Sequence, residues 1–182
     1  MNTAMVIRLV RVLSLLVLAA VMLARPAAAQ TSTLNQELLK DWLGMKDTLV
    51  KLSDAMPEDK YGYKTTPAQR DFGQQILHIA GANLFNLSFL RGKAAVPAID
   101  RNAKSKAEII KAMTDSFDYG EALLKEQTPE SMFEIVQTNQ FLGPSSRARV
   151  IYFLPGHSWD IYGQMVVYLR LNGGTPPASQ RP

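Results

Sequence analysis

The 182-residue sequence contains no cysteine and only two histidines, His78 and His157. Without cysteine the chain cannot form a disulfide bond, and it cannot use a protein thiolate as a nucleophile or a metal ligand. Stability must therefore come from an ordinary hydrophobic core, which a chain of this length can supply. Any histidine chemistry must use one or both of these two positions.

The sequence also lacks the features of nucleic-acid-binding proteins. The formal net charge is +4, but residues 1–29 hold three of the 20 basic residues and no acidic residue, which leaves 17 basic and 16 acidic residues in the rest. No basic stripe is interleaved with aromatic residues, so we expect no nucleic-acid partner. No glycine-rich phosphate loop and no Ser-His-Asp arrangement stands out either.

The first 29 residues have the pattern of a secretory signal peptide. Arg8 and Arg11 precede an apolar run over residues 12–23, and Ala27, Ala28 and Ala29 follow it. The run is shorter than the roughly 20 residues needed to cross a bilayer, and the small residues after it are typical of a cleavage site. We expect cleavage after Ala29 and a periplasmic or secreted protein, with an uncleaved membrane anchor as the alternative.

The remaining residues, 30–182, are predicted to form one all-α domain, a four-helix bundle. Apolar residues recur at helical spacing in four segments, over residues 33–55, 71–92, 105–128 and 144–172. No segment shows a convincing strand-like alternation. The connection over residues 129–143 has mixed character, with a helical turn expected around residues 132–135.

Several residues mark where these helices begin and end. Capping boxes are predicted at Thr33 with Gln36, at Asp71 with Gln74, and at Ser105 with Glu108, and the last helix is expected to stop at Gly173, Gly174, Pro176 and Pro177. Gly73 and Gly81 lie within the second helix, where glycine is unfavourable, so they indicate close packing against a neighbour. Pro155 predicts a kink in the last helix, two residues before His157.

The last helix carries a polar seam on its predicted core side. Helical spacing puts Val150, His157, Ile161, Gln164 and Tyr168 on one side, so His157 is expected to point inward. His78 lies in the middle of the second helix. Inward histidines from two helices of a bundle can converge on a metal ion. The alternative is that both are buried polar residues bonded to neighbours or to each other.

Two histidines make an incomplete metal site. A catalytic zinc normally has three protein ligands and an open position for water. The third ligand is usually added one turn away on the same helix, and the position four residues after His157 is occupied by Ile161, which cannot bind a metal. Asp160, Gln164 and Asn83 are poor substitutes by position or chemistry.

Two stretches identify a family resemblance. MPEDKYGYKTTPAQRDFGQQILHIAG, around His78, and HSWDIYGQMVVYLRLNGGTPPAS, from His157, resemble the DinB-like (DinB/YfiT-like) superfamily of metalloenzymes. The resemblance covers residues 34–179, and the ending YGQMVVYLRLNG is its most specific part. It implies a four-helix bundle in which a histidine of the second helix and a His-x-x-x-His pair of the last helix bind a divalent metal, often zinc or nickel.

The same resemblance implies a function with one important departure. His78 matches the first metal-ligand position and His157 the second, whereas Ile161 stands at the third. Family members with assigned activities are thiol-dependent transferases, isomerases or hydrolases, and family members often form homodimers through helix faces. We therefore expect either a metal-dependent transferase or hydrolase with an altered metal site, or a non-catalytic bundle that binds a small molecule or a partner in the same cavity.

Overall fold

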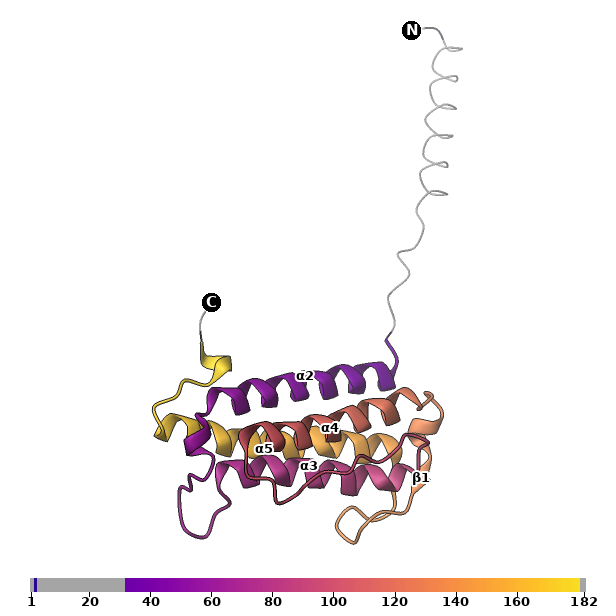
Figure 1. Ribbon diagram of the computed structural model, residues 1–182. Helices are drawn as coiled ribbons and strands as arrows, with labels where there is room; N and C mark the ends of the chain where they lie inside the picture. The colour runs from indigo at the N-terminus through magenta and orange to yellow at the C-terminus, as the bar shows by residue number, and fades with distance from the viewer. Residues whose placement is uncertain (1, 3–31, 181–182) are drawn as a thin grey trace. The chain divides into compact units, whose positions relative to one another are not determined.

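Four long helices form the domain in the computed structural model, which describes residue 2 and residues 32–180. They are α2 (Leu34–Ala55), α3 (Phe72–Leu87), α4 (Lys106–Lys125) and α5 (Arg147–Leu171). Figure 1 shows them side by side along one long axis. The main contacts run from α2 to α4, from α4 to α3, from α3 to α5 and from α5 back to α2. The predicted all-α four-helix bundle is confirmed for the described residues.

Short elements occupy the connections between the long helices. Four 3-10 helices span Glu58–Lys60, Ser88–Leu90, Ser131–Phe133 and Pro177–Ser179, and two short strands, β1 (Ile135–Val136) and β2 (Ser145–Ser146), pair antiparallel. The helical turn expected in the connection before α5 is thus a 3-10 turn followed by β1. The second helix also gives way to a 3-10 turn after Leu87, earlier than predicted.

The last helix begins at Arg147, three residues later than the sequence pattern predicts. Ser145 and Ser146 pair with β1 instead, with Ile135 opposite Ser146. The Ser146 hydroxyl then accepts a hydrogen bond from the Arg149 N–H at 3.2 Å, which caps the helix. The helix continues through Pro155 without interruption.

The predicted caps of α3 and α5 are present. The Asp71 carboxylate accepts from the Gln74 N–H at 2.7 Å, and the Gln74 side-chain oxygen accepts from the Asp71 N–H at 3.0 Å. At the C-terminal end of α5, Gly173 adopts a φ of 78° and the Gly174 N–H donates to the Leu169 carbonyl at 2.9 Å. A glycine in this left-handed conformation ends α5, as the sequence predicts.

The packing of the core accounts for the glycines within the helices as well as for the spacing of the apolar residues. Trp42 of α2 is fully buried, its indole N–H donates to the Phe117 carbonyl at 2.8 Å, and its ring lies against Gly120 of α4. A Cβ at Gly73 would lie 3.0 Å from Ile109, and one at Gly81 would lie 2.7 Å from the Arg101 guanidinium. Close approach at both α3 glycines is therefore confirmed.

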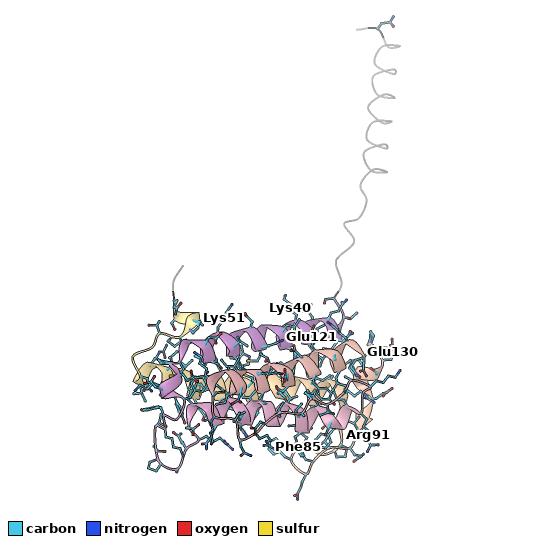
Figure 2. The ribbon with its side chains drawn as sticks, viewed as in Figure 1. Lys40, Lys51, Phe85, Arg91, Glu121 and Glu130 are labelled. Atoms are coloured by element: carbon cyan, nitrogen blue, oxygen red, sulfur yellow. The ribbon has the colours of Figure 1, made fainter. Side chains whose placement is uncertain are left out.

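The outer surface carries the charged residues of the amphipathic helices. Lys40 and Lys51 lie on the exposed side of α2, as Figure 2 shows, opposite its buried apolar residues. Within residues 32–180, no helix combines the length and apolarity that crossing a membrane requires. The predicted signal peptide, residues 1–29, lies outside the described residues and stays a prediction.

Candidate functional site

The bundle brings the two histidines together. His78 projects from α3 and His157 from α5, and these helices are direct neighbours in the bundle. The ring centroids lie 5.1 Å apart and the ring planes meet at 77°, an edge-to-face contact. Two residues far apart in the sequence thus form one pair of side chains.

The pair lies at the edge of the core. Val150, Ile161 and Tyr168 are buried, but His78 and His157 are only half-buried. The expectation that His157 points fully inward is therefore corrected. Four residues advance a helix by about 400°, so His157 lies about 40° around α5 from Ile161. That rotation leaves its ring half-buried at the edge of the core, against His78 of α3.

Both imidazoles are held in the neutral form. Burial lowers the pKa of His78 to about 4, and the charge of Arg70, the neighbouring His157 and the charge of Arg101 act in the same direction. Burial also lowers the pKa of His157; Asp160 opposes this effect and Arg70 adds to it. A neutral imidazole has one N–H donor and one free nitrogen lone pair, so each ring can donate one hydrogen bond and accept another.

A cavity of about 350 Å³ opens beside His78. It is lined by Arg70, Gln74, Leu77, His78 and Arg101, so its charged lining residues are both arginines. Arg70 directly precedes the capping residue of α3, and Arg101 comes from the connection between α3 and α4. A smaller cavity of about 150 Å³ shares Gln74, Leu77 and Arg101 with it.

Neither arginine has a carboxylate partner within the described residues. The ion pairs of this part of the chain use other residues, and no side-chain hydrogen bond of Arg70 or Arg101 joins them to the protein. Both residues are exposed at the cavity. Their charges remain available to a ligand.

Of the residues considered as substitutes for the third histidine, Gln164 and Asp160 are hydrogen-bonded to each other. The Gln164 side-chain oxygen accepts from the Gln75 amide at 2.8 Å, and its amide donates to the Asp160 carboxylate at 3.3 Å. The Asn83 amide nitrogen donates to the Ser116 hydroxyl on α4 at 3.2 Å, while its buried side-chain oxygen has no hydrogen-bond partner among the described residues. Ile161 itself is 2% exposed. Among residues 32–180, no three His, Cys, Asp or Glu side chains gather as a metal-ligand group.

This donor set fits a tight divalent metal site poorly. Two imidazoles supply two ligands where a zinc site normally has three or four. The nearby charges that act on His78 are those of Arg70 and Arg101, and a positive guanidinium repels a cation. The chemistry of the cavity favours a neutral or negatively charged molecule.

A row of aromatic rings continues from His157, outside the lining of the cavity. The Phe153 ring stacks on His157 with centroids 6.0 Å apart and planes 8° from parallel, and Phe141 contacts Phe153 at 5.8 Å. Of the other aromatic residues of α5 near the pair, Tyr168 is buried and Tyr162 half-buried, whereas Trp159 is 52% exposed. The sequence pattern did not identify Phe153, Arg70 or Arg101 as site residues.

The fold and the site place the chain among four-helix bundles that hold a histidine pair between the second and last long helices. The family model of the DinB superfamily matches residues 43–165, and the chain belongs to this superfamily. Both histidines lie within the matched residues. No curated protein matches the chain.

Two solved structures resemble this fold. A DinB-like protein from Bacillus cereus ATCC 10987 is 21% identical, with 77% of this chain and 93% of that chain covered and a TM-score of 0.68. A DinB-like protein from Bacillus subtilis is 16% identical, with 80% of this chain and 99% of that chain covered and a TM-score of 0.62. At these identities the likeness shows the fold alone.

Proposed function

We propose that the chain is an exported member of the DinB superfamily that binds a small molecule around His78 and His157, without a tightly held metal. One observation carries this proposal. Two neutral imidazoles meet beside a cavity of about 350 Å³ whose charged lining residues are Arg70 and Arg101. A pocket with a few convergent polar groups and shifted pKa values is the usual form of a ligand site.

The position of Ile161 supports the loss of the metal. Its side chain is part of the hydrophobic core, so no water or side chain from that position extends the histidine pair toward a third ligand. Two imidazoles alone should bind a divalent ion more weakly by orders of magnitude than a complete site, because each protein ligand adds to the chelate.

A metal-dependent transferase or hydrolase is the second candidate. The observation that favours it is the contact between the neutral rings of His78 and His157, since neutral imidazole is the form that binds zinc or nickel. The resemblance implies that such a metal would activate water or a low-molecular-weight thiol. The third ligand would then be a water molecule or a side chain other than histidine.

Metal analysis of the protein purified after export separates the two candidates. We expect the wild type to hold well under one zinc or nickel ion per chain after dialysis, and Ile161→His to hold close to one. His78→Ala should abolish the gain when combined with Ile161→His. Stoichiometric metal in the wild type that disappears in His78→Ala would instead support the metal-dependent enzyme.

A further inference from the structure

We propose that the pocket beside His78 binds an organic anion, with Arg70 and Arg101 holding its carboxylate or phosphate group and Leu77 and the His78 ring contacting its apolar part. This inference rests on the proposed small-molecule function and names the class of ligand. It adds two arginines and the apolar side chain of Leu77 to the histidine pair.

The charges of the pocket point to an anion. Arg70 and Arg101 line the cavity, and neither has a carboxylate partner in the described part of the chain. The planar guanidinium group bonds carboxylate and phosphate through two parallel N–H groups. Residues 30–182 carry nearly equal numbers of basic and acidic side chains, so two such groups at one cavity form a local positive field that attracts an anion.

Asp71, next to Arg70 in the chain, and Asp160, on α5, form no ion pair within the described part of the chain that would neutralise this field. Asp71 lines the neighbouring smaller cavity, but its carboxylate caps α3 by accepting the Gln74 N–H. Asp160 acts on His157 and accepts from the Gln164 amide. Neither carboxylate pairs with Arg70 or Arg101, so the arginines are left for a ligand.

The fold positions both arginines. The hydroxyl of the buried Tyr168 donates to the Arg70 carbonyl at 2.9 Å, which ties the backbone before α3 to α5. The Arg101 guanidinium lies against Gly81, where a Cβ would come within 2.7 Å of its nitrogen. The missing side chain at Gly81 therefore makes room for Arg101 to lie against α3. Positioning of this kind reduces the ordering cost of binding.

A row of contacting rings leads from the cavity to the surface through the two histidines. His78 lines the cavity and contacts His157, His157 stacks on Phe153, and Phe153 contacts Phe141. Phe141 is 79% exposed, so this row of rings reaches the surface. A neutral His78 can donate one N–H to the anion while its ring packs against the ligand body. The arrangement fits an anion attached to an aromatic or aliphatic group.

Calorimetric titration with defined probes tests the inference. The probes are 3-phenylpropionate, phenyl phosphate, inorganic phosphate and the neutral 3-phenylpropanol. We expect the wild-type protein to bind 3-phenylpropionate or phenyl phosphate at least tenfold more tightly than 3-phenylpropanol, with affinity falling as salt rises. The stronger of the two organic anions identifies carboxylate or phosphate as the preferred group. Binding of inorganic phosphate alone would overturn the assignment of an organic ligand.

Charge-matched variants locate the anion. Arg70→Gln and Arg101→Gln should each weaken the anionic probe about tenfold or more, because each removes a charge-assisted hydrogen bond. Arg91→Gln is the control, because it removes the same charge at the other end of α3 from Arg70; Figure 2 labels Arg91. This variant should change the affinity for the anionic probe less than twofold. Equal weakening by all three variants would overturn the inference.

Gly81→Ala separates the position of Arg101 from its charge. A Cβ there displaces the guanidinium, whereas alanine is the better helix former, so binding should weaken severalfold while the fold is retained by circular dichroism. Unchanged binding in Gly81→Ala together with unchanged binding in Arg101→Gln would remove Arg101 from the site.

If 3-phenylpropanol binds as well as the anions, the anion inference fails while the small-molecule function stands. If no probe binds and the wild type holds stoichiometric metal, the proposed function itself fails.

Discussion

The ring of His78 on α3 meets the ring of His157 on the neighbouring α5 edge to face, with centroids 5.1 Å apart. At this distance a proton on one ring disfavours a proton on the other. Burial and the charge of Arg70 act on both rings in the same direction. The pair is therefore neutral near pH 7, and this state makes both rings available to a ligand.

Lowering the pH should destabilise the protein through His78. Its pKa falls from 6.5 in the unfolded chain to about 4 in the folded one, so between these values the unfolded chain binds more protons. The contribution of the neutral His78 to the free energy of unfolding is then complete above about pH 6.5 and is lost as the pH falls toward 4. Because the ring is half-exposed, solvent screening reduces the effect to about 1–2 kcal/mol.

Urea denaturation of the wild type and His78→Gln at pH 7.5, 5.5 and 4.5 measures this dependence. The difference in unfolding free energy between the two proteins should narrow as the pH falls, because glutamine does not titrate. A constant difference across the three pH values would show that His78 has an ordinary pKa in the folded protein.

Ile161→His should destabilise the core and allow the site to bind a metal ion. Ile161 is 2% exposed, so a polar ring at this position should cost about 2–4 kcal/mol in the absence of metal. Zinc or nickel should restore part of that loss, because a ligand that binds only the folded state raises its stability. Thermal melts with and without zinc, and with EDTA, report both effects.

Ile161→Gln is the matched control for this substitution. It places a polar side chain in the same part of the core without an imidazole, so it should lose similar stability and recover none with zinc. Recovery in Ile161→Gln equal to that in Ile161→His would mean that the ion acts elsewhere.

The sequence predicted the bundle because helix periodicity and capping are local. Asp71 with Gln74 and the Gly173 stop lie as predicted, since each depends on residues only a few positions apart. The start of α5 was missed because Ser145 and Ser146 pair with β1, a contact that periodicity does not report. Pairing across a connection is decided by tertiary structure.

The candidate site was only partly predictable for the same reason. A helical wheel placed His157 near the core side, but whether its ring enters the core or lies at its edge depends on where α3 lies. Arg101 belongs to a connection with no periodicity, and its contact with Gly81 of α3 exists only in the folded bundle. The sequence did give one signal, a glycine in mid-helix that implies a close neighbour.

Gly120→Ala should destabilise the bundle, whereas Gly44→Ala should not. A Cβ at Gly120 would lie 2.2 Å from the fully buried Trp42 ring, and a Cβ at Gly44 of α2 would meet nothing within 4 Å. Overpacking should cost Gly120→Ala about 1–3 kcal/mol, while helix propensity should stabilise Gly44→Ala by about 0.5–1 kcal/mol. Urea denaturation measures both; equal effects would contradict the tight contact between α2 and α4.

Tyr168→Phe should affect both stability and anion binding, but to different degrees. The Tyr168 hydroxyl donates to the Arg70 carbonyl at 2.9 Å from a side chain that is 1% exposed. Its removal should cost about 1 kcal/mol of unfolding free energy. It should also weaken an anionic probe severalfold by loosening the backbone of Arg70, with less change for the neutral 3-phenylpropanol. Denaturation and calorimetry on the same preparation separate the two effects. Equal weakening of both probes would show that Tyr168 shapes the pocket as a whole, and would argue against a role in positioning the arginine.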